Sequence, residues 1–242
     1  MMRFDIITIF PKIFDSYLNE SILKRAQNRG LVKIKVHNLR DYTADKHKKV
    51  DDSPYGGGAG MVLMAEPIIK ITDSLRKRSK NRKKTKIVIF SAKGKQFNQK
   101  TAYDWAKKYD NIIFISGRYE GIDERVRQIL SARGGSAFGG KAEEISIGYY
   151  VLTDGDVAAM VVISAVSRLI PGVIKLESLE EESHWNLLVR KEKDISLGKG
   201  LEYPHYTRPE VLVYKGKKYR VPKVLLSGNH KKIGEWRRKR GI

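Results

Sequence analysis

The sequence contains no cysteine among its 242 residues. This absence excludes disulfide bonds, zinc–thiolate sites and thiol nucleophiles together. No apolar run approaches the ~18 residues that a membrane-spanning helix needs. The amino-terminal apolar stretch contains Asp5 and ends at Pro11, which is typical of a first strand and not of a cleaved signal peptide. We therefore expect a cytoplasmic protein without a membrane-spanning segment.

Several catalytic motifs are also missing. The absence of a P-loop argues against nucleotide hydrolysis, and the absence of G-x-G-x-x-G argues against a dinucleotide fold. The absence of a G-x-S-x-G elbow argues against an esterase. The five histidines show no H-x-x-x-H spacing, so we expect no histidine metal site.

Acidic residues are few relative to basic ones. The chain has 27 Asp and Glu against 48 Lys and Arg, which gives a net charge of +21. Basic runs occupy residues 46–49, 76–86 and 230–240, and the second holds eight basic residues in eleven. One such run is usually a solvated surface, but three without a matching acidic block favour a nucleic-acid partner. A membrane surface is the main alternative, although no basic amphipathic helix with an apolar face supports it.

The order of elements predicts an α/β fold with a mostly parallel sheet. Hydrophobic periodicity predicts strands at 4–10, 32–36, 86–90 and 112–115 and helices at 12–29, 97–108, 122–130 and 157–170. The glycine-rich segments 51–60 and 133–141 are expected to be loops. Segment 175–200 is typical of a polar linker, and the basic tail over 201–242 is too short to be stable alone.

Three strand-like runs end in turns that contain glycine, at 90–95, 113–126 and 144–156. Glycine at the carboxyl end of a parallel strand lets the backbone approach a ligand. Ordinary tight turns explain the spacing equally well. Three such turns could converge on one small ligand, but the spacing does not say which ligand.

Longer strings carry a resemblance across nearly the whole chain. They are FDIITIFP (4–11), VHNLRDYTADKHKKVDD (36–52), YGGGAGMV (55–62), SGRYEGIDERV (116–126), EEISIG (143–148), AVSRLIPGV (165–173), YPHYTRPEV (203–211) and VPKVLLSGNHKKI (221–233). In these strings, in this order, the chain resembles the bacterial tRNA (guanine-N1)-methyltransferase family that modifies guanosine 37. That family belongs to the knotted SPOUT superfamily.

The resemblance implies three parts and a homodimer. Residues 1–174 would form a knotted methyltransferase domain with a deep trefoil knot, which binds S-adenosyl-L-methionine (AdoMet). Residues 175–200 would form a flexible linker that carries the catalytic base. Residues 201–242 would form a small, mainly helical, basic domain that binds tRNA.

The resemblance also implies the binding residues. It places AdoMet at the three glycine turns, on Ser91, Ala92, Gly94, Gly117, Tyr119, Glu120, Gly121, Ile147, Gly148, Tyr149, Tyr150, Val151, Leu152 and Gly155. It places tRNA on Ser183, His205, Tyr206 and Arg208. Mg²⁺ is implied as an assisting ion, without an indication of its ligands.

Methylation of guanine N1 removes the proton of that nitrogen, so a carboxylate base is needed near N1 and a cation near O6. The resemblance assigns the base to Glu182 and the cation to Arg168. Without it, Glu182 would be one more acid of a solvated linker and Arg168 an ordinary surface partner of an acid.

The chain departs from the family pattern at several positions. Glu182 replaces an aspartate, and a shift of ~1 Å from its extra methylene can cost ~100-fold in rate. Tyr149 replaces an acid, Ala92 replaces a proline, and Asp154 puts a side chain where glycine normally lets the cofactor approach. Segments 133–141 and 186–199 are typical of insertions.

These departures keep two alternatives open. One is a tRNA-binding relative with weakened or lost catalysis because of Tyr149, Asp154 and Glu182. The other is a related enzyme with a different target base.

Overall fold

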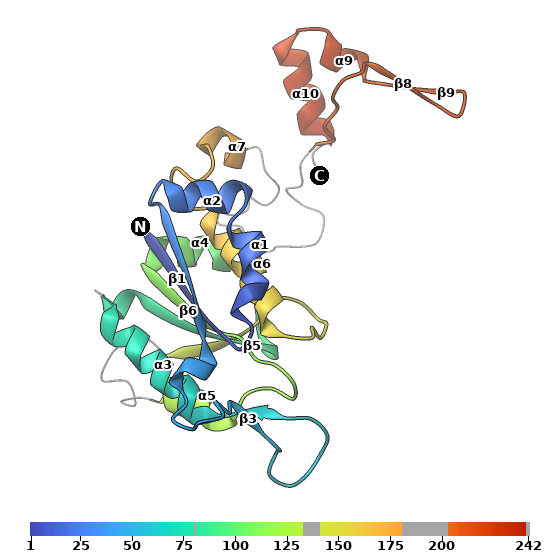
Figure 1. Cartoon of the computed structure of the whole chain (residues 1–242). Helices are drawn as coiled ribbons and strands as arrows, with labels where there is room; N and C mark the ends of the chain where they lie inside the picture. Colours follow the sequence, from blue (N-terminus) through green and yellow to red (C-terminus); the bar gives the residue numbers. More distant parts are fainter. Residues whose placement is uncertain (80, 133–140, 181–202, 241–242) are drawn as a thin grey trace. The chain divides into compact units, whose positions relative to one another are not determined.

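The computed structural model describes residues 1–79, 81–132, 141–180 and 203–240 (Figure 1). The chain divides into two compact units, Met1–Lys175 and Leu176–Ile242. The described helices include none that is both long enough and apolar enough to span a membrane.

The first unit is built on a five-stranded sheet. Its strands are β1 (Met2–Thr8), β2 (Val32–Asn38), β5 (Thr85–Gln96), β6 (Asn111–Ile115) and β7 (Ala142–Ser146). Their order is β2-β1-β6-β5-β7, and every pairing between them is parallel. The predicted α/β fold with a mostly parallel sheet is therefore confirmed.

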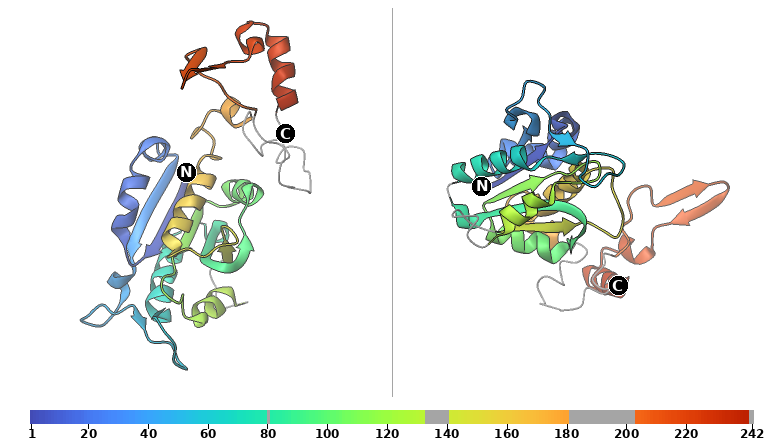
Figure 2. Two further views of the ribbon diagram at one scale, coloured as in Figure 1. Left: turned by 90° about the vertical axis from the view of Figure 1, so that its right-hand side faces the viewer. Right: turned by 90° about the horizontal axis from the view of Figure 1, so that it is seen from below.

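Helices cover both faces of the sheet, as Figure 2 shows. One core joins Phe4, Ile6 and Phe114 to α1 (Asp15–Leu18), α2 (Ser21–Asn28), α4 (Gln99–Lys108) and α6 (Gly155–Ser167). The opposite core joins Ile7, Ile113 and Ile115 to α3 (Ala65–Arg78) and α5 (Glu124–Ser131). Successive residues of a strand point to opposite faces, so apolar runs buried on both sides form these central strands.

The single helix expected over 12–29 is wrong. The segment forms a 3-10 turn η1 (Pro11–Phe14), then α1, then α2. Asn19 donates its side-chain amide to the Asp15 carbonyl at 2.9 Å, and Ser21 has a positive φ of 48°. Asparagine competes for backbone hydrogen bonds in this way, which ends α1 while the apolar positions still reach the core.

Two further expectations need correction. Segment 51–60 is not entirely loop, because β3 (Asp51–Asp52) pairs antiparallel with β4 (Val62–Leu63). Helix α3 was not expected, although Ile68, Ile71 and Leu75 are buried at helical spacing. Its last turn belongs to the basic run 76–86, which obscured the periodicity.

The second unit contains α7 (Leu176–Glu180), the antiparallel hairpin β8 (Val211–Tyr214) and β9 (Lys217–Arg220), α9 (Lys223–Leu226) and α10 (His230–Arg240). The hairpin turn consists of Lys215 and Gly216, whose φ values of 47° and 74° are typical of a type I′ turn. The expected linker thus begins with a short helix. Its continuation over 181–200 lies outside the described residues, as does segment 133–140.

Candidate functional site

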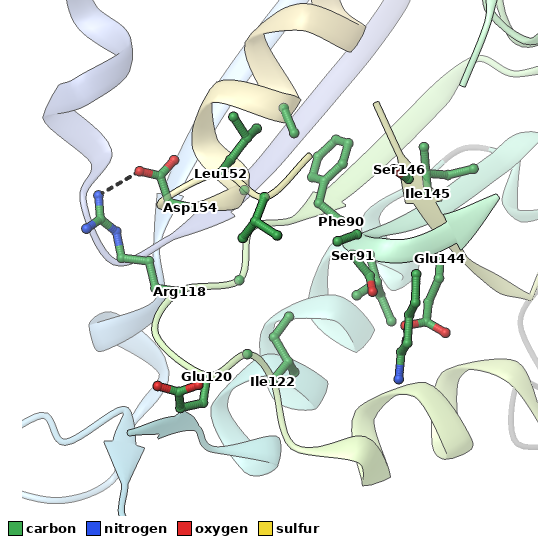
Figure 3. A pocket seen from close by; sticks show the side chains of 18 of the residues that line it. Phe90, Ser91, Arg118, Glu120, Ile122, Glu144, Ile145, Ser146, Leu152 and Asp154 are labelled. Carbon is green, nitrogen blue, oxygen red and sulfur yellow. Dashed lines mark hydrogen bonds and ion pairs between the residues drawn. The ribbon is translucent and has the colours of Figure 1, made fainter. Parts of the chain in front are cut away.

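A hollow of about 330 Å³ opens at the carboxyl ends of β5, β6 and β7. Its wall is formed by the turns that follow these strands and by the start of α6 (Figure 3). Such a volume lies at the lower end of the ~300–1,000 Å³ range of small-molecule sites, which in open α/β sheets occupy this edge.

Most residues that the resemblance assigns to AdoMet line this hollow. They are Ser91, Ala92, Gly117, Tyr119, Glu120, Gly121, Ile147, Tyr150, Val151, Leu152 and Gly155. The three glycine turns therefore converge on one space, as the convergence hypothesis required.

Gly94, Gly148 and Tyr149 do not line it. A Cβ atom on Gly94 would come within 2.6 Å of backbone atoms of Glu144 and Ile145, so glycine is needed there for β5 to pack against β7. A Cβ on Gly148 would collide with the Tyr150 ring. The Tyr149 side chain is 95% exposed. In this structure the two glycines serve packing.

Backbone hydrogen bonds fix the central turn. Gly155 N donates to Gly117 O at 2.9 Å, Leu63 N donates to Gly121 O at 3.0 Å, and Glu120 N donates to Met61 O at 3.1 Å. Gly121 has a φ of 119°, which side chains with a Cβ rarely adopt. This turn is therefore held from two sides in a conformation that requires glycine.

Asp154 was expected to put a side chain at the cofactor space, and it does line the hollow, where its carboxylate has two sets of partners. Its Oδ1 accepts the backbone N–H of Asp156 at 2.9 Å and of Val157 at 3.2 Å, which caps α6. Its Oδ2 accepts a hydrogen bond from the Arg118 guanidinium at 3.1 Å, drawn in Figure 3. The side chain is 5% exposed. The carboxylate thus serves as a helix cap and ion-pair partner, with extended backbone that any residue can adopt.

Arg118 extends this connection. Its guanidinium carbon lies 4.3 Å from the centroid of the Phe10 ring, within cation–π range. One side chain thereby joins the turn after β6, the start of α6 and the segment after β1.

We expect the Asp154→Ala substitution to destabilise the first unit by about 1–2 kcal/mol, because it removes an N-cap and the partner of Arg118. For a unit of this size the melting temperature should fall by roughly 3–6 °C in a calorimetric scan. Asp154→Asn is the matched control, since asparagine caps as well as aspartate. If Asp154→Gly instead tightened AdoMet binding tenfold or more, the side chain would be an obstruction and the capping assignment would be wrong.

Asp156 is an acid near the hollow that is unsuited to act as the base. Its side chain is fully buried. Burial raises the pKa of the Asp156 carboxyl, and the hydroxyls of Ser116 and Thr8 oppose this effect. Among the described residues, neither oxygen of Asp156 has a hydrogen-bond partner of good geometry. Because this carboxyl is buried, we do not assign it the role of the base.

One end of the hollow carries charged side chains that the sequence did not single out. Lys93 Nζ lies 3.9 Å from Glu144 and 4.0 Å from Glu124, and Arg127 Nε lies 3.7 Å from Glu144. Glu124 and Glu144 belong to two of the matching strings. Membership of these strings was the only sequence feature that pointed to Glu124 and Glu144, and it did not show that the two strings meet in space.

Arg168, the expected cation, does not line this hollow. It lines a second one of about 380 Å³, together with Tyr17, Ile22 and Ser164. Arg168 follows the last residue of α6, whereas Gly155 is the first. Thirteen residues at 1.5 Å each separate the two ends by about 20 Å. Within one chain the structure therefore does not bring Arg168 to the glycine turns.

The remaining expected site residues belong to the second part of the chain. Glu182 and Ser183 lie outside the described residues. His205, Tyr206 and Arg208 are exposed. The His205 ring lies 4.6 Å from that of Tyr203, and the Tyr206 ring lies 6.3 Å from that of Trp236. Aromatic and basic side chains thus gather on this unit.

Comparison with known proteins gives a match over almost the full length. A family model described as tRNA (Guanine-1)-methyltransferase TrmD matches residues 2–242. The chain belongs to this family.

Individual members of the tRNA (guanine-1)-methyltransferase family are close in sequence. The chain is 52% identical to the tRNA (guanine-N(1)-)-methyltransferase of Thermomicrobium roseum, over 98% of this chain and 78% of the relative. It is 49% identical to that of Carboxydothermus hydrogenoformans, over 100% of this chain and 83% of the relative. For Clostridioides difficile the identity is 46%, over 100% and 93%.

Proposed function

We propose that the chain transfers a methyl group from AdoMet to N1 of guanosine 37 in tRNA, in the cytoplasm. The observation that carries this proposal is the convergence of three glycine turns on one hollow. The model of the tRNA (guanine-1)-methyltransferase family matches residues 2–242 of the same chain.

The lining of the hollow suits AdoMet. Phe90, Ile145 and Leu152 supply apolar surface for a purine ring, and the Glu120 carboxylate is an acceptor for sugar hydroxyls. The pairs formed by Lys93 with Glu124 and Glu144 suit the charged amino-acid end. When bound there, AdoMet supplies an electrophilic methyl group.

The protein then has to remove the N1 proton of guanine and stabilise the charge that develops on O6. We assign the first task to the Glu182 carboxylate, which accepts the proton. We assign the second to the Arg168 guanidinium, which donates hydrogen bonds to O6. Asp154 lines the hollow, and its carboxylate is held by the cap of α6 and by Arg118.

Mg²⁺ is the ion that the resemblance implies. Among the described residues, no group of three or more His, Asp or Glu side chains could hold a metal ion. Mg²⁺ often binds through one or two carboxylates together with substrate and water. The described side chains do not form such a site by themselves, and no step of the transfer is assigned to the ion.

The homodimer is part of this proposal, and its support is the position of Arg168. Helix α6 carries Val157, Val161 and Ser164, and Arg168 is the C-cap residue that follows it; the spacings of four, three and four place these residues along one face. Val157 and Val161 are 41% and 43% exposed. If two copies pack these faces antiparallel about a two-fold axis, Arg168 of one copy approaches the α6 start of the other. Each hollow would then receive its cation from the second copy.

The trefoil knot is part of this proposal. Its support is the contact between the turns at 117–121 and 148–155. Gly155 N bonds to Gly117 O, and Arg118 forms an isolated bridge with Asp154. A chain that threads through a loop would produce such a close crossing.

The first experiment is methyl transfer from labelled AdoMet to two unmodified tRNA transcripts. Both have guanosine at 36, and they have guanosine or adenosine at 37. We expect label only in the first, because adenine N1 carries no proton for the base to remove. Label in both or only in the second would show a different target base. Label in neither, with tRNA still bound, would establish the inactive relative.

A further inference from the structure

The basic run 76–86 is the motif that the proposed methyl transfer does not use. Four exposed side chains of this run and two exposed lysines from α4 form what we call the amino-edge surface. They are Lys77, Arg78, Lys83 and Lys84 from the run, and Lys107 and Lys108 from α4. They come from the end of α3, the 3-10 turn η3 (Arg82–Lys84) and the end of α4.

The strand register places this surface at one edge of the sheet. Arg3 pairs with Lys33 and Asn111, and Thr85 also pairs with Asn111, so four strands begin at one level. In Figure 1 this edge lies beside the N marker, where β1 begins. The AdoMet hollow lies at the carboxyl ends. A strand of seven residues, such as β1, separates the two edges by about 23 Å.

Two segments of the surface are directly joined. Asp110 N donates to Lys84 O at 2.9 Å, and the Lys84 ammonium lies 3.8 Å from the Asp110 carboxylate. Lys107 and Lys108 immediately precede this segment. Their ammonium groups lie 4.1 Å and 5.5 Å from the centroids of the Tyr103 and Tyr109 rings. The end of α3 is joined to the same region, because Ser79 Oγ lies 2.8 Å from Thr85 Oγ1. The segments that carry these cations are therefore neighbours.

The amino-edge surface carries more positive charge than the stabilisation of helix ends accounts for. Cations at a helix C-terminus interact favourably with its dipole, but the effect fades within the last turn. This explains Lys77, Arg78, Lys107 and Lys108, but not residues 82–84, which follow α3. Burial lowers the pKa of Arg76, the Asp73 carboxylate opposes this, and the nearby charge of Arg82 lowers the pKa further. Within 1–79 and 81–132, Lys77, Arg78 and Lys83 form no ion pair with an acid.

The surroundings favour RNA over a lipid surface. Membrane-surface binding needs apolar side chains beside the cations. Among the described residues, no large hydrophobic side chain is exposed within 77–79, 81–84 or 104–110, and Met1, which precedes β1 at this edge, is a single exposed side chain and not an apolar face. A phosphate backbone needs only the cations, and counterion release then provides the affinity.

We propose that the amino-edge surface binds RNA phosphates and forms a second contact for tRNA, outside the anticodon stem-loop. The proposal rests on the proposed function in taking tRNA as the RNA. The contact is independent of sequence, and it lies on the opposite edge of the sheet from the reacting base.

The test uses the full chain with Lys77, Arg78 and Lys83 all changed to glutamine. The control changes Lys24, Lys35 and Lys95 to glutamine, which removes the same net charge from exposed positions elsewhere. Binding of fluorescent full-length tRNA and of an isolated anticodon stem-loop is measured by anisotropy over a salt series, without AdoMet. Thermal unfolding shows that both variants fold.

For full-length tRNA we expect roughly tenfold weaker binding than in the control and a salt slope smaller by about 2–3. Stem-loop binding should match the control. A salt slope equal to that of the control would overturn the proposal, as would an equal loss for the stem-loop. Loss of binding to anionic lipid vesicles with unchanged tRNA binding would assign the surface to membranes instead. Because no methyl transfer is measured, an inactive enzyme would not affect these outcomes.

Discussion

Replacing Arg168 with alanine should lower the rate of methyl transfer by about 10²–10³-fold, which is typical for loss of one donor to a developing oxyanion. AdoMet affinity should stay unchanged, because Arg168 lines a different hollow from the glycine turns of its own chain. Single-turnover kinetics and calorimetry measure the two quantities separately. Arg168→Lys keeps the charge but loses the planar fork, so an intermediate rate is expected. Weaker AdoMet binding in Arg168→Ala would show a role in the cofactor site instead.

A mixture of two inactive variants tests whether Arg168 acts across a dimer. Ala92→Trp fills the hollow, which Ala92 lines, and should abolish AdoMet binding. In a mixed dimer with Arg168→Ala, one site combines an intact hollow with an intact arginine. Random mixing of equal amounts should then restore about a quarter of the wild-type rate in a two-fold dimer. If Arg168 serves its own chain, no mixed dimer has an intact site and the mixture stays inactive.

Replacing Glu182 with glutamine should lower the transfer rate by about 10²–10⁴-fold, the usual contribution of a general base. The amide has nearly the same shape but cannot accept the N1 proton, so AdoMet and tRNA binding should persist. The rate is measured in single turnover as a function of pH. The rising limb that belongs to the base should disappear in this variant.

Two controls accompany this prediction. Glu181→Gln removes the neighbouring acid of the same run and should retain the wild-type rate. Glu182→Asp restores the family's residue, and it should keep at least the wild-type rate if the extra methylene is a handicap. Full activity of Glu182→Gln would show that another group takes the proton.

The sequence was informative where local chemistry decides the structure. The alternation of Val32, Ile34 and Val36 with lysines predicted β2, and apolar β-branched runs predicted β5 and β6. Glycines at strand ends predicted turns, and parallel strands bring such turns to one edge. The sequence left this convergence open beside ordinary tight turns, and the observed strand order β2-β1-β6-β5-β7 brings the turns together.

Other features depend on contacts that no local pattern contains. The interruption of 12–29 depends on where the Asn19 amide finds an acceptor. The charged end of the hollow joins Lys93 to residues 31 and 51 positions further along the chain, at Glu124 and Glu144. The resemblance gave Arg168 a role at O6 of the target base, but a motif does not give the distance from Arg168 to the glycine turns.

The sequence around Asp154 contained an N-cap pattern that was interpreted in another way. Aspartate directly before a helix is a common N-cap, and α6 begins at Gly155. Comparison with a glycine pattern made the same residue an expected obstruction. Local capping chemistry was the better guide to its conformation.

The tie between Asp154, α6 and Arg118 has a consequence for the thermodynamics of ligand binding. The tie restricts backbone dihedrals at one end of the turn over 148–155 before any ligand arrives. Conformational entropy that a freely moving glycine would lose on complex formation is lost instead when the chain folds. We expect such preorganisation to slow dissociation of the complex. The corresponding loss of conformational entropy lowers the free energy of unfolding instead.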